Sequence, residues 1–574
     1  MNLKNKINKT GAALAALMLF ASCNKYINKP PLTSFVDNTY WQNETEVQLY
    51  CNGFYSEFNG AGTSITSTIN SNGGTGSESD FYFASFSDDQ ANAGDIFPVT
   101  SAGTATTWST PYSYIRLAEL LLERIDQVPN MSDAAKNNYR GFAYFWLAEE
   151  YYDLVRHYGD VPFVNKYLDQ DQDSSIIWGQ RVNRDQVMDS VLNFINLAVA
   201  DLYNKATADG TTGLGTNTVN QDVANALKSR ICLFEGSWAK YHENNSTRAT
   251  QYFQACDEAC KALMNTGLYS LNADYQTVYS NQGLSTGGEV LLYRAYAIGI
   301  LSNDVYEYAV ATTPAPYGLT KDAVESFLCT DGQPISSSPL YKGDAAEPGA
   351  VAGTFSIANT VLANRDKRLA ETVGTTLGFI GHPDSTGAIS TTGYTIKRFV
   401  YAPNPVNSNV INYPIYWYPE ILLNDAEALA ELGNIAQSDI DNTVNKLRAR
   451  AGVAPLEMAN IPNDPKRDAD VSPLLWEIRR ERRVELMLTS FRYWDLRRWG
   501  KISYLDPSVK PDIFAGANTA GTTYTGAVTG NGYVSAPAVN RVVTIPKNYL
   551  DFIPTAQVQM YQNAGITFPQ NPGW

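Results

Sequence analysis

Residues 476–501, WEIRRERRVELMLTSFRYWDLRRWGK, constrain the fold more than any other stretch of this chain. The segment holds seven arginines, three glutamates and one aspartate, interleaved with large apolar residues. Because guanidinium groups bind carboxylates through paired hydrogen bonds and stack on aromatic rings, the pattern predicts a partly buried helix whose charges pair within the chain. We expect this helix to pack on a helical scaffold, with Arg497 and Arg498 bound to acids from elsewhere. A nucleic-acid role is disfavoured, since the acids offset the arginines and the 574-residue chain carries a net charge of −15.

The amino terminus has the features of an export signal. Lysines at positions 4, 6 and 9 precede a short apolar run over residues 11–21, and small residues come directly before Cys23. The pattern looks like a bacterial lipoprotein signal, which predicts removal of residues 1–22 and acylation of Cys23. A cleaved secretory peptide without a lipid is the alternative. The polar, proline-containing stretch that follows predicts a lipidated tether over residues 23–43.

Helical patterns dominate two parts of the chain, about residues 110–267 and 412–501. Apolar residues recur there at helical spacing, which predicts helices at residues 44–58, 114–128, 132–158, 184–202, 220–241, 249–266 and 415–432, and one capped by Ser438. Helix pairs joined by short turns favour tetratricopeptide-like hairpins, and an irregular helical domain is the alternative. Because a single hairpin cannot bury its own face, the late hairpin should stack on the earlier ones.

Loop-rich parts, about residues 59–110, 268–411 and 502–574, are expected to lie over this scaffold. They are rich in turn-forming residues, and one short strand is predicted at residues 289–293. Binding residues are common on loops that a rigid scaffold holds, and the first loop contains Asp80, Phe81, Phe83 and Trp108. These side chains are therefore candidate ligand contacts, and packing beneath the loop is the alternative.

Signatures of metal binding and catalysis are scarce. Only three histidines occur, at unrelated spacings, so a His-based metal centre or a Ser–His–Asp triad is poorly supported. Asp88–Asp89 and the acidic run at residues 169–173 offer oxygen ligands for Ca²⁺, but solvated acidic loops are the favoured interpretation, and no cofactor is predicted. The five cysteines after Cys23 contain no CxxC pair and are interpreted as buried free thiols.

Several motifs together resemble the SusD/RagB family of surface lipoproteins from Bacteroidetes-type bacteria. They follow the family's order along nearly the whole chain: FASC at 20–23, YW at 40–41 with Glu44, YRGFAY at 139–144 running on to YGDVP at 158–162, FLCTDGQPI at 327–335, NRDKRL at 364–369, the late hairpin at 418–453, the Arg-rich signature at 481–500, IP at 553–554 and QNPG at 570–573. One departure is Thr489–Ser490, where the family commonly has Glu–Gly or Glu–Asn, so one carboxylate is missing from the charge network.

The resemblance implies a mainly α fold, in which tetratricopeptide-like hairpins carry a large irregular part with a few short strands. It implies a single SusD-like domain over residues 44–574, lipid-anchored at the cell surface of the outer membrane. It further implies a SusC-like TonB-dependent transporter as partner, oligosaccharide or in some members peptide as ligand, and no enzymatic activity. Family ligand sites lie on loops before the first repeat helix and after the mid-chain strand, which makes the candidate contacts Asp80, Phe81, Phe83, Trp108, Tyr293, Tyr296, Tyr306, Tyr308 and Tyr317.

Two other classes of function stay open. A glycoside hydrolase needs two carboxylates about 5 to 9.5 Å apart. The 58 acidic residues do not exclude such a pair, although no acidic motif stands out. A scaffold or adhesin built on helical repeats would need no small ligand. The abundance of Tyr, Trp, Asn and Asp in the loops favours saccharide binding, because sugars present apolar CH faces and many hydroxyls.

Overall fold

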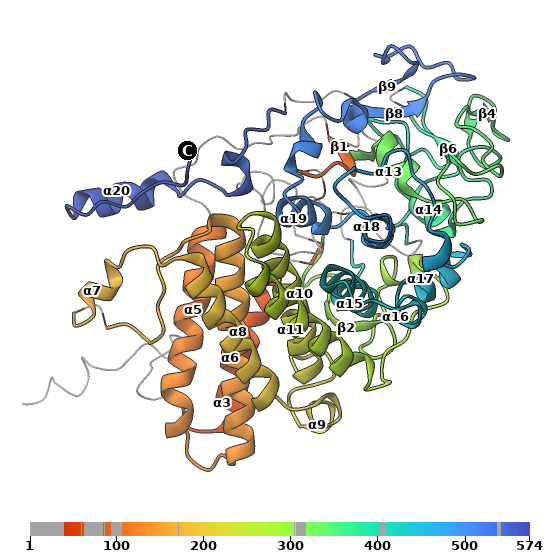
Figure 1. Ribbon diagram of the computed structural model, residues 1–574. Coiled ribbons are helices and arrows are strands. Elements are labelled where there is room, and N and C mark those ends of the chain that lie inside the picture. Colours follow the sequence, from red (N-terminus) through yellow and green to blue (C-terminus); the bar gives the residue numbers. More distant parts are fainter. Residues whose placement is uncertain are drawn as a thin grey trace, which may run out of the picture.

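A computed structural model describes residues 40–58, 60–61, 84, 86–92, 106–169, 171–303, 305, 317–379, 381–401, 409–536 and 541–574. Several predictions fall outside these described residues: the signal at residues 1–22, Cys23 and nearly all of the tether, and the candidate contacts Asp80, Phe81, Phe83, Tyr306 and Tyr308. The described part is mainly helical, as predicted (Figure 1).

Long helices lie side by side in one half of the molecule (Figure 1). Each contacts the next in the order α5 (Thr106–Arg124), α6 (Asp133–Tyr158), α8 (Arg184–Asp201), α10 (Gln221–Tyr241) and α11 (Ser246–Met264). The row continues from α11 to α15 (Tyr418–Leu432) and on to α18 (Pro473–Glu485). The late helices therefore stack on the early ones, as predicted, although a long loop-rich segment separates them in sequence.

Shorter helices join and flank this row. They are α3 (Glu44–Asn52), α7 (Ser174–Ile177), α9 (Lys205–Gly210), α13 (Lys321–Ser326), α14 (Lys367–Thr372), α16 (Gln437–Asn442), α17 (Val444–Ala451), α19 (Phe491–Arg498) and α20 (Thr555–Asn563). In Figure 1, α20 projects beside the carboxyl terminus, whereas α14, α16 and α17 lie with the strands on the opposite side of the molecule.

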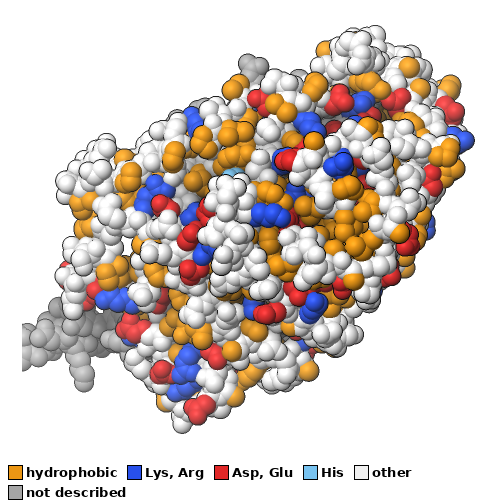
Figure 2. All heavy atoms as spheres, viewed as in Figure 1, with side chains coloured by type: hydrophobic (Ala, Val, Ile, Leu, Met, Phe, Trp, Pro, Cys, Tyr) orange, Lys and Arg blue, Asp and Glu red, His pale blue; other side chains and the backbone are white. Residues whose placement is uncertain are grey.

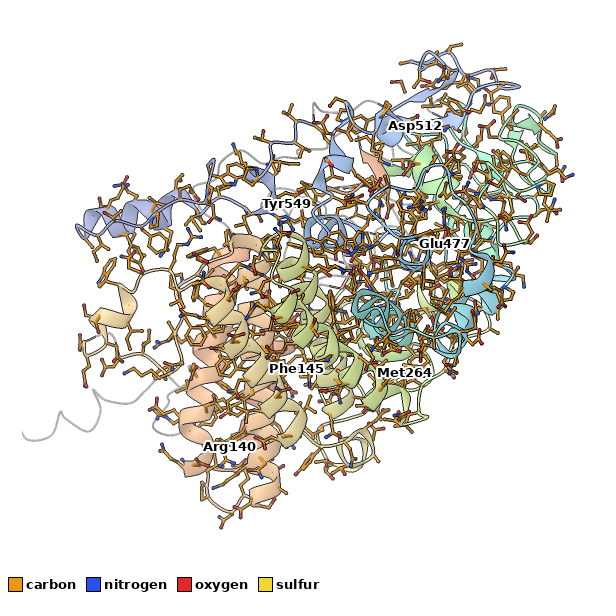
Figure 3. All side chains as sticks on the ribbon, viewed as in Figure 1. Arg140, Phe145, Met264, Glu477, Asp512 and Tyr549 are labelled. Atoms are coloured by element: carbon orange, nitrogen blue, oxygen red, sulfur yellow. The ribbon has the colours of Figure 1, made fainter. Side chains whose placement is uncertain are left out.

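Helix α6 shows how local sequence sets the ends of a helix. The Ser132 hydroxyl accepts a hydrogen bond from the Ala135 backbone N–H at 3.2 Å, and Gly159 follows the last turn with φ of +70°. Both capping predictions are confirmed. Phe145, Trp146 and Tyr151 are fully buried, and Phe145 lies within the helical row in Figure 3. Helix α6 is thus enclosed on more than one face, as its sequence predicts.

Short antiparallel strands pair segments that are far apart in sequence. β2 (Val290–Arg294) pairs with β7 (Tyr413–Trp417), and β1 (Gln90–Asn92) pairs with β3 (Tyr317–Leu319). A three-stranded sheet contains β4 (Glu347–Pro348), β5 (Phe355–Ser356) and β6 (Thr376–Leu377), and β8 (Ala515–Asn518) pairs with β9 (Tyr533–Ser535). The strand predicted near residues 289–293 is confirmed, but β7 occupies residues that were predicted to begin a helix. All five residues of β7 are buried, and α15 begins only at Tyr418, with a proline in its first turn.

Other predicted boundaries were also wrong. Helix α5 begins at Thr106, so Trp108 lies on a helix rather than in a loop. The second helix of the late hairpin is split at Thr443, which has φ of −124° and ψ of −90°, and the residue before α16 is Ala436 rather than Ser438. The Arg-rich segment forms two helices, α18 and α19, because Leu488 between them adopts φ of +60°, which a helix cannot accommodate.

The turn between α18 and α19 contributes side chains to two hydrophobic cores. Leu486 and Phe491 belong to the larger core of the helical row, whereas Met487 and Leu488 belong to a second core beneath the strands and loops. Burial of Leu488 in this second core offsets the strain of its backbone. The five cysteines after Cys23 are buried and free, as predicted. In the described part of the chain, no helix combines the length and apolar character needed to cross a membrane.

Candidate functional site

The arginines of α19 pair with acids from other elements, as predicted. Arg498 donates to both oxygens of Glu427 on α15, at 2.6 and 2.7 Å, and Arg497 lies 2.8 Å from Asp551. Burial alone would raise the pKa of Glu427, but Arg498 and Arg479 outweigh it and hold the pKa at about 2. Glu427 is therefore ionised at neutral pH, and its ion pair ties α19 to the helical row.

The buried carboxylates of α18 pair with arginines from two distant segments. Arg368 on α14 lies 2.6 Å from Glu481 and 2.8 Å from Glu485, and Arg448 on α17 lies 2.9 Å from Glu477. Figure 3 labels Glu477 among the close-packed side chains of this region. Breaking one such buried pair leaves an uncompensated charge, so the network holds the mid-chain segment, the late hairpin and α18 in one arrangement.

Asp88 and Asp89 were predicted to be solvated or to bind Ca²⁺, and the structure contradicts both interpretations. Both side chains are buried, and their partners are arginines of the Arg-rich segment. Arg492 donates to the two oxygens of Asp88 at 2.7 and 2.8 Å, and Arg483 donates to Asp89 at 2.8 Å. Burial would raise the pKa of Asp88, but Arg483 and Arg492 outweigh it and hold the pKa below its ordinary value. For Asp89, burial prevails over Arg483 and raises the pKa to about 6.

These two aspartates hold the start of β1, and β1 brings two loop segments together. The Thr320 hydroxyl donates to the Asp88 carbonyl at 2.7 Å, and the Thr320 backbone N–H donates to the Asp89 carbonyl at 3.0 Å. The register of the sheet places Asn92 opposite Tyr317. Because the strands are antiparallel, the chain leaving β1 and the chain entering β3 meet at one end of this sheet.

Other residues of the loop-rich parts pack in the second hydrophobic core. Tyr296, Val305 and Tyr317 share one hydrophobic cluster with Ala61, whose backbone N–H donates to the Tyr296 hydroxyl at 3.0 Å. Asn409 forms an antiparallel bridge to Asn303. We call Ala61, Asn92, Tyr296, Val305, Tyr317 and Asn409 the loop base. The loop base is the candidate functional site, because segments from the first and second loop-rich parts converge on it.

The structure places four of the predicted contacts. Trp108 is 5% exposed and packs edge-on against Tyr158, with ring centroids 4.9 Å apart, so it belongs to the helical core and not to the loop base. Tyr296 and Tyr317 are buried within the loop base. Tyr293, on β2, is half-buried. The role of all four in ligand binding stays a prediction.

Two supporting residues were missed by the reading of the sequence. The side-chain amide of Asn217 binds the backbone of Tyr293 on both sides, accepting from its N–H at 3.1 Å and donating to its carbonyl at 2.8 Å. Asn412 accepts a hydrogen bond from the Tyr296 backbone N–H at 2.8 Å. Each amide fixes the backbone that presents a tyrosine, and no local motif marks either residue.

Metal ligands are not assembled in the described part of the chain, where no group of three or more His, Cys, Asp or Glu side chains is placed to hold an ion. In the acidic run at residues 169–173, Asp173 accepts from the backbone N–H of Asp169 at 2.8 Å and from Lys166 at 2.5 Å. The hydrogen bond between Asp169 and Asp173 closes a turn, and Lys166 pairs with Asp173. Both contacts agree with the interpretation of residues 169–173 as an acidic loop.

Two family models match this chain. Residues 302–574 match the model described as the SusD family, and residues 38–166 match the model described as "Starch-binding associating with outer membrane". Solved SusD-like proteins share this mainly helical fold. The chain belongs to the SusD/RagB family, as its motifs predict.

Individual relatives are distant but cover nearly the whole chain. A SusD-like protein of Formosa agariphila is 22% identical over an alignment of 533 positions, which covers 86% of this chain and 92% of that protein. A SusD-like carbohydrate-binding protein of Bacteroides fragilis has a TM-score of 0.69 at 21% identity and covers 92% of this chain and 99% of its own. A laminarin-binding SusD-like protein has a TM-score of 0.54 at 18% identity, with 93% and 100% covered. At such identities the structures establish the shared fold.

Proposed function

We propose that this protein is a cell-surface lipoprotein that captures oligosaccharides and delivers them to a SusC-like TonB-dependent transporter. The protein itself carries out no catalysis. Family membership supports this proposal. The matching family model is named for starch binding and association with the outer membrane, and similar solved structures are named for carbohydrate and laminarin binding. In this proposal Cys23 bears the lipid, and residues 23–43 form the lipidated tether.

The observation that carries the proposal is that segments of the loop-rich parts converge at the loop base. Four segments distant in sequence meet there, beside the half-buried ring of Tyr293. The ion pairs of Asp88 and Asp89 with α18 and α19 hold one of these segments against the scaffold. Loops held by a rigid scaffold suit ligand capture, because little ordering entropy is lost when the ligand binds.

Binding of glycans by the purified protein tests the proposal directly. Wild-type protein should bind members of a panel of neutral glucans, including starch and laminarin oligosaccharides, without forming shorter products. Tyr293→Ala should weaken the measured affinity about tenfold, which corresponds to about 1.4 kcal/mol. Tyr144→Ala is the matched control, since Tyr144 is also half-buried but stacks on Phe194 in the helical row.

The same experiment separates the alternatives. Saturable binding of peptides in place of glycans would identify a peptide-binding member of the family, and release of shortened saccharides would identify a glycoside hydrolase. Trp108→Ala should act mainly on stability, because Trp108 packs in the helical core. Unchanged glycan affinity for Tyr293→Ala would show that the assignment of Tyr293 as a ligand contact is wrong.

Delivery is tested in the native host by affinity purification of the tagged protein. The proposal predicts that a large outer-membrane barrel protein co-purifies and that deletion of this gene abolishes uptake of the bound glycan. A protein that binds no such barrel, and whose deletion leaves uptake intact, would instead fit a scaffold or adhesin.

A further inference from the structure

A second concave site lies beside the Arg-rich helices. It is near the end of the β1–β3 sheet that is opposite Asn92 and Tyr317. Residues of α13, α18 and α19 and of the segments around them line it: Asp322, Glu325, Ser326, Asp464, Lys466, Val471, Trp476, Arg479, Arg480, Arg483, Arg492, Trp499, Lys501, Tyr504 and Lys510. We call it the Arg–Trp pocket. Its cavity volume is about 80 Å³, and the site opens to solvent.

Positive charge dominates the lining of the Arg–Trp pocket. Seven lining residues are Lys or Arg and three are Asp or Glu, in a protein with a net charge of −15. All three acids are already bound by cations or donors. Asp322 lies 2.7 Å from Arg483, Glu325 lies 2.7 Å from Lys466, and Asp464 pairs with Arg480. The pocket therefore offers an incoming ligand few free acceptors.

Lys510 is the lining cation that has no carboxylate within ion-pair distance in the described part of the chain. Its ammonium group lies 4.2 Å from the ring centroid of Tyr504. By contrast, the lining arginines have partners behind the wall: Arg492 binds Asp88, and Arg479 binds Glu431 at 3.0 Å. Lys510 is thus the group most available to a ligand carboxylate or sulfate.

Aromatic side chains form the apolar part of the wall. Trp476 is half-buried, and its indole Nε1 donates to Asp464 at 2.9 Å, which fixes the plane of the ring. Trp499 and Tyr504 are buried deeper, with 4% and 8% exposed. Figure 2 shows Lys and Arg side chains among hydrophobic ones over the face where α18 and α19 lie in Figure 1. A fixed aromatic plane in the same lining as a lysine without an ion pair among the described residues suits a ring that has an apolar face and an anionic substituent.

We propose that the Arg–Trp pocket binds a pyranose unit that carries a carboxylate or sulfate group. The apolar face of the sugar packs against Trp476, and its anionic group pairs with Lys510. This inference rests on the proposed saccharide-binding function and adds a second subsite that selects acidic glycans. Thr320 connects the two sites, since it follows β3 and binds the backbone of Asp88 and Asp89, whose arginine partners line the pocket.

The test uses the full mature chain labelled with 5-fluorotryptophan, with the Trp476 signal assigned by Trp476→Phe. The probes are tetragalacturonic acid, a sulfated carrageenan tetrasaccharide, laminaritetraose and sodium sulfate. An acidic tetrasaccharide should shift the Trp476 signal, and Lys510→Met should weaken its affinity at least fivefold. Lys446→Met is the matched control, because Lys446 is exposed on α17 outside the pocket and has no ion pair in the described chain.

Each outcome decides a separate question. A shift with either acidic tetrasaccharide that Lys510→Met weakens supports the inference, and the uronate and sulfate arms show which acid is preferred. A Trp476 signal that moves with neither of them, or an affinity that Lys510→Met leaves within twofold, overturns it. A response to sodium sulfate equal to that of the acidic tetrasaccharides would also overturn it, by revealing a simple anion site. Neutral glucan binding that persists in those cases leaves the proposed function standing, whereas absence of all glycan binding contradicts the proposed function itself.

Discussion

At the scale of single residues, buried ion pairs distinguish this protein from a simple helical repeat. Arg368, Arg448 and Arg498 are each at most 2% exposed and bind carboxylates of other elements. Taking such charges out of water costs several kcal/mol per ion before pairing, so each pair is stable only while both partners are in place. These pairs therefore specify which segments lie together more than they add to net stability.

Asp88→Asn should lower the free energy of unfolding by about 3 to 5 kcal/mol, because it leaves Arg492 buried without its carboxylate. Urea unfolding at pH 7 measures the loss. Asp189→Asn is the matched control; Asp189 is 59% exposed and pairs with Arg248, so its loss should be below about 1 kcal/mol.

The destabilisation caused by Asp88→Asn should become smaller as the pH falls. The folded pKa of Asp88 lies below its ordinary value of 3.8, so its contribution is complete above about pH 4 and is lost as the pH falls through the folded pKa. Wild type and variant should converge in stability under strongly acidic conditions. An equal difference at pH 7 and well below pH 3 would show that Asp88 acts through packing and not through its charge.

At the scale of elements, close helix packing depends on small residues at particular positions. Helices α10 and α11 make the most extensive contact in the helical row, and Gly236 lies at their interface. A Cβ at position 236 would lie 2.7 Å from the ring of Phe253 on α11. The helices can be this close only because residue 236 lacks a side chain.

Gly236→Ala should therefore destabilise the protein by about 1 to 3 kcal/mol, since the added methyl group must displace a buried ring. Gly210→Ala is the matched control. Gly210 ends α9, and a Cβ there would meet nothing within 4 Å, so the substitution should be neutral or stabilise by up to about 1 kcal/mol. Thermal unfolding of both variants compares them; equal melting temperatures would contradict the packing argument.

At the scale of the whole molecule, the Arg-rich segment joins the helical row to the loop-bearing part. The turn between α18 and α19 has side chains in both hydrophobic cores, and the arginines on either side of the turn hold the segment that leads into β1. The predicted role of this segment as an internal fastening is therefore confirmed. The Arg-rich segment also forms one wall of the Arg–Trp pocket.

Anchoring of the whole molecule is predicted to depend on Cys23. Cys23→Ser should move the protein from the membrane fraction to the soluble fraction of the cell envelope, because the acyl chains would have no attachment site. Immunoblotting of fractionated cells measures the change. Cys51→Ala is the control, since Cys51 is a buried free thiol and its loss should leave the protein in the membrane fraction. Retention of Cys23→Ser on the membrane would contradict lipidation at this residue.

The sequence by itself determined the features that depend on neighbouring residues. The caps at Ser132 and Gly159, the glycine that ends α15, and the buried faces of α6 follow from hydrogen bonds and side-chain periodicity within a few residues. The order of family motifs likewise predicted the fold class and the family. Caps and periodicity depend on neighbouring residues, and motif order depends only on position along the chain. Neither requires knowledge of the path of the backbone.

Only the tertiary structure decided the partners. Asp88 and Arg492 are 404 residues apart in sequence, and nothing near either residue identifies the other. For the same reason Asp88–Asp89 looked like an exposed acidic pair, and Trp108 looked like a loop residue although α5 carries it into the core. A charge next to apolar residues must find a partner or stay in water, and the chain path determines which occurs. In the Arg-rich segment the sequence determined that the charges would be paired, and the fold determined with which acids.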